Sequence, residues 1–89
     1  MKTMKLTLFV TGQSIRSQQA MINLNAICKE SLNGDAEVEI IDVLENPEEA
    51  EKMQILATPA LIKEEPLPVC RIIGDLSNRD KVLNALQKY

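Results

Sequence analysis

The chain has 89 residues and a mass of 9.9 kDa, with 45% apolar and 26% charged residues. A chain of this size buries roughly 64% of its surface on folding, enough for one small core, so we expect a single domain over residues 1–89. The composition excludes a disordered tail, a collagen and a coiled coil, and the net charge of −3 argues against nucleic-acid partners.

No uncharged apolar stretch approaches the length that a bilayer requires. The first ten residues mimic a signal peptide, but their apolar region is too short and no small-residue cleavage site follows. We therefore expect a cytoplasmic protein without membrane contact.

The first half of the chain predicts a strand, a helix and a second strand. Residues 5–10 carry apolar side chains on both faces, which suits a central strand. Ser14 can cap a long helix that ends at Asn33-Gly34. Residues 36–44 predict the second strand, so the three elements form a βαβ unit with parallel strands. The apolar stripe of the helix consists of Ala20, Met21, Leu24, Ile27 and Cys28.

The second half predicts two helices around two strands. Asn46-Pro47 starts the first helix, with Asn46 as cap, Pro47 at the first helical position and Glu49 closing a capping box, and the helix runs to about Leu56. Residues 60–63 and 69–73 predict strands, separated by a stiff turn at 64–68. Ser77 begins a capping pattern with Asp80 and starts the last helix. The apolar face of that helix consists of Val82, Leu83 and Leu86.

The resulting order is β-α-β-α-β-β-α. Four strands with helices on both faces predict an α/β protein, a three-layer sandwich of the thioredoxin type.

Few side chains in this sequence can support catalysis. The chain has no histidine, which removes the commonest general base and the commonest metal ligand. Cys28 and Cys70 form no Cys-x-x-Cys pair, and we expect buried free thiols. A thioredoxin-type enzyme needs a thiolate at the start of its first helix, but the loop 11–17 contains no cysteine. We therefore expect no enzyme, no metal and no cofactor.

The segment from Asp35 to Glu51 contains eight carboxylates and no basic residue. The rest of the chain contains ten basic residues and five acidic ones. This segment predicts a solvated acidic face, with an acidic docking patch for a basic partner as the alternative.

Three separated blocks of the sequence carry a family resemblance. The first two are Ile41–Leu44 with Asn46-Pro47, and Ile55–Pro59. The third and most extensive is Arg71–Arg79, followed by Lys81–Leu83. With these blocks the chain resembles the KaiB family of small bacterial clock proteins, and the resemblance covers nearly the whole chain.

This resemblance implies a non-enzymatic regulator that binds the ring of a KaiC-type ATPase, competes with SasA, and captures KaiA where a KaiA is present. It also implies two folds. One is the thioredoxin-like order given above, and the other is a resting fold, β-α-β-β-α-α-β, that shares the first half and assembles as tetramers or dimers.

The residues around Pro59 fit both folds. Thr58 and Pro59 can lead into a strand, yet Thr58 is also a good helix cap and Pro59 a good first helical residue. We therefore treat Pro59 as a structural pivot and fold switching as a hypothesis.

The resemblance makes Lys63 and Arg71 the candidate partner-binding residues. The alternatives are a solvated strand end for Lys63 and pairing with a carboxylate such as Asp75 for Arg71. Compared with the clock-type members it resembles, the chain departs at four positions: Gln19, Cys70, Ala85 and Gln87. The resemblance implies that the missing basic residues at Gln19 and Cys70 weaken electrostatic docking, and Ala85 in place of glycine favours the last helix. Two other functions stay open, namely a role in stress adaptation without a full oscillator and a divergent redox protein using Cys28 or Cys70.

Overall fold

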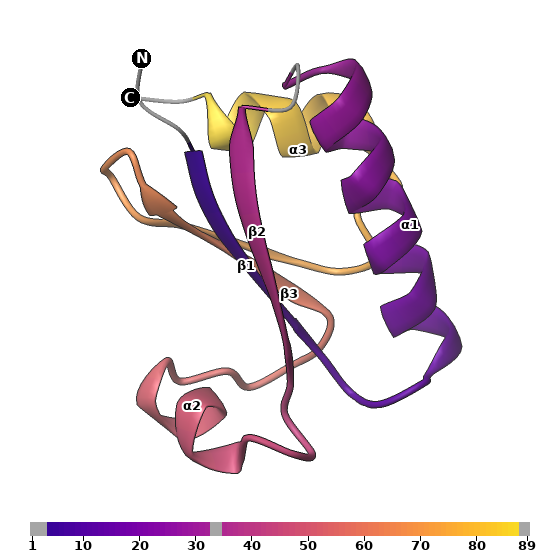
Figure 1. Cartoon of the computed structure of the whole chain (residues 1–89), viewed down its shortest axis with the longest axis vertical. Helices are drawn as coiled ribbons and strands as arrows, with labels where there is room; N and C mark the ends of the chain where they lie inside the picture. The colour runs from indigo at the N-terminus through magenta and orange to yellow at the C-terminus, as the bar shows by residue number, and fades with distance from the viewer. Residues whose placement is uncertain (1–3, 33–34, 88–89) are drawn as a thin grey trace.

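The computed structural model describes residues 4–32 and 35–87. Within those ranges the elements follow the predicted order β-α-β-α-β-β-α (Figure 1). The strands form one mixed sheet in the spatial order β2-β1-β3-β4. The thioredoxin-like order is therefore the arrangement seen, with a strand after Pro59 where the resting fold would have a helix.

The strand β1 (Met4–Val10) is central, as predicted. It pairs in parallel with β2 (Ala36–Asp42) and antiparallel with β3 (Ala60–Glu65). Every residue from Leu6 to Val10 is buried, because helices or chain segments cover both faces of the strand. The other edge of the sheet is β4 (Cys70–Ile73), which pairs antiparallel with β3.

The helix α1 (Ile15–Glu30) connects the two parallel strands. Its cap is Ser14, as predicted, whose hydroxyl accepts a hydrogen bond from the Ser17 amide at 3.2 Å. The helix stops at Glu30, and the predicted end at Asn33-Gly34 lies outside the described residues. Its buried residues lie on one stripe toward the sheet: Ser17, Ala20, Leu24 and Ile27.

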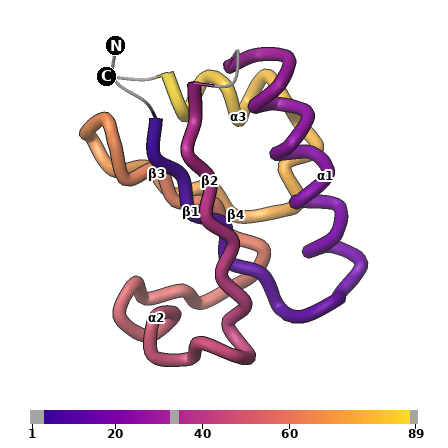
Figure 2. The backbone as a smooth tube through the Cα atoms, in the orientation of Figure 1, coloured from indigo at the N-terminus to yellow at the C-terminus, as the bar shows by residue number. Residues whose placement is uncertain are grey.

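Both α1 and α3 (Arg79–Leu86) pack on the same face of the sheet (Figures 1 and 2). The main core lies between them and the strands and consists of apolar side chains, with Ser17 and Lys63 also buried on this face of the sheet. Burying apolar side chains there is the main driving force for folding. The core consists of Leu6, Leu8, Val10, Ala20, Leu24, Ile27, Leu61, Leu76, Val82 and Leu86.

The opposite face has a thinner cover. A smaller buried cluster of Phe9, Ala60 and Ile62 is covered partly by Met53 and Ile55. These two residues follow α2 (Pro47–Lys52), whose own residues are not buried. The second face is therefore covered mainly by the end of the short helix and the segment after it.

The prediction that α2 runs to Leu56 is wrong, because a Schellman motif ends the helix early. Gln54 has a left-handed φ of 54°, and its amide bonds to the Glu51 carbonyl at 3.1 Å. The Ile55 amide bonds to the Ala50 carbonyl at 2.9 Å. The turn directs Ile55 toward the sheet instead of continuing the helix.

The start of α2 also differs from the prediction. Asn46 precedes the helix, but its side chain makes no cap bond and donates instead to the Asp42 carbonyl at 3.2 Å. The Asn46 amide donates to the same carbonyl at 2.9 Å, so it is not available for a capping box with Glu49. Pro47 does occupy the start of the helix.

Four strand and helix boundaries differ from the prediction, and local hydrogen bonds account for two of them. The strand β2 ends at Asp42 rather than Leu44, because the Asp42 carboxylate accepts the Leu44 amide at 2.9 Å and turns the chain. The strand β3 extends through Glu65, into the expected turn, and β4 starts at Cys70, one residue later than expected. The cap of α3 is Asn78 rather than Ser77, because the Asn78 side chain accepts the Lys81 amide at 3.1 Å.

Candidate interaction surface

The loop after β1 lies beside the segment that leads into β3. The hydroxyls of Thr11 and Thr58 are hydrogen bonded to each other across these two segments. The Thr11 amide donates to the Ser17 hydroxyl at 3.0 Å, which ties the loop to the first turn of α1. Two paired threonine hydroxyls thus stand near the start of α1, where thiol exchange would need a reactive cysteine.

Large apolar side chains are exposed around this pair. Leu56 is 96% exposed and lines a hollow of about 450 Å³ together with Thr11 and Thr58. Ile15 is 79% exposed at the start of α1, and Leu44 is 68% exposed beside Gly12. Ile73 is also exposed, at the end of β4 opposite Ala60. We call this set, Ile15, Leu44, Leu56 and Ile73, the Thr11–Thr58 surface.

Exposed apolar residues gathered at one end of a small protein are typical of a contact site for another protein. The tube view shows that the turn after β1, the α2 region and the segment into β3 lie toward the same end of the molecule (Figure 2). This arrangement suits contact with the surface of another protein. The four exposed side chains are apolar, and none of them is an acid, a base or a nucleophile.

Arg71 lies next to this surface and is exposed. Its guanidinium donates to the Met53 carbonyl at 2.7 Å and to the Gln54 carbonyl at 2.9 Å. The alternative that Arg71 pairs with Asp75 is therefore not seen. Arg71 satisfies carbonyls at the C-terminal end of α2, where a cation also complements the helix dipole.

Lys63 lies elsewhere, inside the molecule. It is 1% exposed, and its Nζ donates to the Leu86 carbonyl at 3.2 Å. The alternative of a solvated strand end is therefore not seen either. Lys63 and Arg71 lie on neighbouring strands but on opposite faces of the sheet, because Lys63 shares the α3 side with Leu61 and Arg71 faces α2.

Pro59 is buried where the Thr58 segment enters β3. Its carbonyl accepts the Gly74 amide at 2.9 Å, which links the start of β3 to the end of β4. Whether Pro59 acts as a pivot between two folds stays a prediction.

The cysteines lie in different elements and both are free and half-buried. Cys28 is on α1, where burial raises the pKa of its thiol. A raised pKa lowers the thiolate fraction, so this cysteine lacks the activation that exchange chemistry requires.

The acidic segment is mostly solvated. Seven of its eight carboxylates belong to exposed residues, and the exception is Asp42. The Asp42 carboxylate has a structural role, because it accepts the amides of Gly12 at 3.1 Å and Leu44 at 2.9 Å.

Two negative findings concern the described residues. Residues 4–32 and 35–87 contain no group of three or more potential ligands that could hold a metal ion. None of the helices in that part of the chain is both long and apolar enough to span a bilayer.

Comparison with solved structures defines the class of protein. The fold is similar to mitochondrial thioredoxin 3 from Saccharomyces cerevisiae, with a TM-score of 0.78 and 16% identity over 100% of this chain and 81% of that one. It is also similar to the N-terminal domain of SasA from Synechococcus elongatus, with a TM-score of 0.80 and 22% identity over 100% of this chain and 88% of that one. The protein is a thioredoxin-like domain with hydroxyls near the start of its first helix.

Sequence comparison narrows this class. A family model described as the KaiB domain matches residues 7–88. Circadian clock protein KaiB3 from Synechocystis sp. is 54% identical over 86 residues, covering 97% of this chain and 84% of the relative. Circadian clock oscillator protein KaiB from Thermostichus vulcanus is 51% identical over 85 residues, covering 96% and 79%. The chain belongs to the KaiB family, whose members are non-enzymatic clock components.

The exposed apolar residues of the Thr11–Thr58 surface were not predicted from the sequence as a contact site. A signal for one of them was present, since Ile15 lies outside the apolar stripe of α1 and has no core position to fill. Leu56 offered no such signal, because the prediction placed it inside a longer helix.

Proposed function

We propose that this protein binds the ring of a KaiC-type ATPase through the Thr11–Thr58 surface and thereby modulates the ATPase's phosphorylation cycle in a circadian or related timing system. The observation that carries the proposal is the exposed apolar set around a loop without a reactive thiol. The proposed role in a timing system is supported by the relatives, which are named as circadian clock proteins. Cytoplasmic location, capture of KaiA where one is present, and tetramers or dimers at rest belong to the same proposal.

Arg71 and Lys63 enter the proposal in different ways. Arg71 is exposed beside the surface and can contact a partner directly. Lys63 is buried under α3, so in this fold it supports the site from inside. Direct contact through Lys63 requires α3 to move.

The test is a binding measurement between the purified protein and its cognate KaiC in the presence of ATP. Leu56→Ala removes the most exposed side chain of the surface without touching the core, and we expect it to weaken binding about tenfold or more. Leu67→Ala is the matched control, because Leu67 is 73% exposed in the turn between β3 and β4. We expect that variant to change binding less than about twofold.

The third variant is Arg71→Ala, and we expect it to weaken binding about tenfold. We also expect added salt to lower the binding affinity of the wild type more than that of the variant, because the variant lacks the charge that salt screens. Equal binding by Leu56→Ala, Arg71→Ala and the wild type would show that this surface does not bind the partner. If neither the wild type nor any variant binds KaiC, the proposed partner is wrong.

A further inference from the structure

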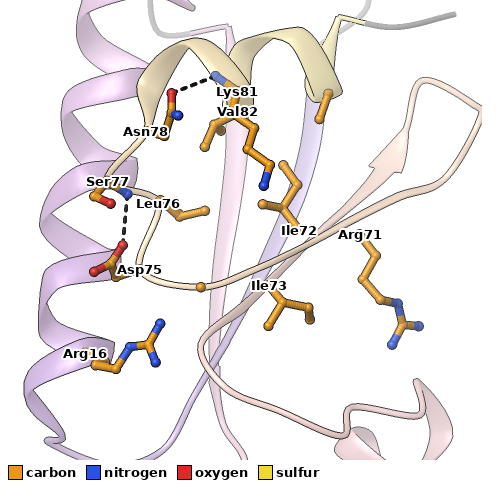
Figure 3. Close-up of a pocket in the computed structure, with 12 residues that line it drawn as sticks. Arg16, Arg71, Ile72, Ile73, Asp75, Leu76, Ser77, Asn78, Lys81 and Val82 are labelled. Carbon is orange, nitrogen blue, oxygen red and sulfur yellow. Dashed lines mark hydrogen bonds between the residues drawn. The ribbon is translucent and has the colours of Figure 1, made fainter.

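A second hollow lies at the β4 edge of the sheet, on the side of α1 and α3. Its volume is about 530 Å³, within the range of small-molecule sites. Figure 3 shows that the loop from Gly74 to Asn78 borders it, with α1 on one side and α3 above. Its apolar lining consists of Ile72, Ile73, Leu76, Val82 and Ala85.

Two cations from different helices border this apolar lining. Arg16 comes from α1, and its guanidinium lies over Gly74, with Nη2 3.9 Å from the position that a Cβ there would take. Lys81 comes from α3 and extends along the hollow toward Ile72 (Figure 3). Neither side chain has a hydrogen bond or ion pair with another residue of the described ranges. Arg71 also lines the hollow, but its guanidinium turns away to the carbonyls after α2.

One carboxylate lines the same hollow and is already engaged. Asp75 accepts the Ser77 amide at 3.1 Å, and hydrogen bonds from the side chain and backbone of Ser77 hold the pKa of Asp75 below its ordinary value, with a smaller contribution from Arg16. Two cations without partners in the described ranges, Arg16 and Lys81, therefore accompany one engaged carboxylate, in a protein whose net charge is −3.

Gly74 keeps the hollow open beside Arg16. Its φ of +125° is a conformation that side-chain-bearing residues rarely adopt, so this position stays without a Cβ. The first turn of α3 adds the positive end of a helix dipole near Asn78.

We propose that this hollow binds a small molecule that joins an apolar ring or short chain to a phosphate or carboxylate group. The apolar part lies on Ile72 and Ala85, and the anionic group lies between Arg16 and Lys81. Arginine forms paired hydrogen bonds to phosphate and carboxylate oxygens, and the lysine supplies a second charge. This proposal does not depend on the partner proposed above.

The test is a titration of the whole 15N-labelled protein with phenyl phosphate at constant ionic strength, followed by NMR. We expect saturable shifts at the amides of residues 74–82 and at Arg16. Arg16→Gln and Lys81→Gln each remove one exposed cation, and we expect each to raise the Kd about fivefold or more. Lys29→Gln is the matched control, an exposed lysine of α1 outside the hollow, with an expected change below about twofold.

Two further probes separate the parts of the ligand. We expect benzyl alcohol and inorganic phosphate to bind about tenfold more weakly than phenyl phosphate, because each lacks one of the two features. The proposal fails if shifts do not saturate, if they spread over β2, or if Lys29→Gln weakens binding as much as the two test variants. It also fails if benzyl alcohol binds as well as phenyl phosphate.

Discussion

Lys63 gives the clearest case of a side chain whose surroundings decide its role. Its stem is buried among core residues, and its ammonium meets the last carbonyl of α3. The final carbonyls of a helix lack partners within the helix, and a cation near them complements the helix dipole. Lys63 therefore links β3 to the end of α3 through one charged hydrogen bond.

Two substitutions of Lys63 should separate packing from charge. Lys63→Met keeps the buried stem, and we expect the unfolding free energy to change by no more than about 1 kcal/mol, because the lost bond and the relieved desolvation of the ammonium oppose each other. Lys63→Ala leaves a cavity and should cost about 2–5 kcal/mol. Chemical denaturation measures both. If Lys63→Met is as destabilising as Lys63→Ala, the charged bond outweighs the packing.

The same variant tests Lys63 as a partner contact. A loss of KaiC binding by Lys63→Met at unchanged stability would show that the ammonium meets the partner after α3 has moved. Unchanged binding would keep Lys63 as an internal support.

Cys28 gives a prediction with a defined pH dependence. Because burial raises the pKa of this thiol above 9.0, the unfolded chain releases the proton first as the pH rises. The corresponding stability is present in full well below the pKa of the thiol in the unfolded chain and is lost as the pH rises through the folded pKa. We expect stability at alkaline pH to fall more in the wild type than in Cys28→Ser, as measured by denaturation at several pH values.

The thiol also tests the redox alternative. We expect Cys28 to react with iodoacetamide at pH 8 about tenfold more slowly in the native protein than in the unfolded chain. A faster reaction in the native protein would revive thiol chemistry for this fold.

At the scale of elements, the helix caps offer a paired comparison. Asn78 caps α3 through its side chain, whereas Asn46 precedes α2 without such a bond. We expect Asn78→Ala to lower the unfolding free energy by about 1 kcal/mol. Asn46→Ala should cost about half as much or less, since it removes one exposed bond to the Asp42 carbonyl. Equal losses would contradict the difference between the two caps.

These caps also show how far a sequence can predict the elements. Their number, order and type followed from apolar periodicity and from Pro and Gly positions. Their ends depended on choices between competing hydrogen bonds, such as the Asp42 carboxylate accepting two amides. A left-handed Gln54 in place of glycine gave no sequence signal for the end of α2.

The candidate site was harder to predict than the fold. Period-two alternation puts Lys63 on the same side of β3 as Leu61, so its inward direction was visible in the sequence. The carbonyl that accepts the hydrogen bond from its ammonium could not be predicted, because α3 reaches Lys63 only after the chain has folded. The contact between Thr11 and Thr58 likewise joins segments far apart in the sequence.

At the scale of the whole molecule, the hypothesis of two folds can be tested through the last helix. Ala85 lies in α3, and Ala85→Gly should lower helix stability by up to about 1 kcal/mol. If a second arrangement exists, its backbone amide resonances should increase in this variant. Ala26→Gly is the control, because α1 belongs to the half that both folds share.

One experimental outcome would contradict the hypothesis that the chain adopts two folds. A single set of amide resonances in the wild type and in Ala85→Gly, unchanged when KaiC is added, would count decisively against fold switching.

The bond between Lys63 and Leu86 also bears on how the second half of the chain rearranges. If α3 detached, the Lys63 ammonium would lose the Leu86 carbonyl and would meet water instead, so the charge itself adds little to the cost of detaching the helix. The cost of that motion comes mainly from exposing apolar side chains of α3 such as Val82 and Leu86. Detachment of the helix therefore does not require β3 to move with it, and it uncovers a lysine that the folded form conceals.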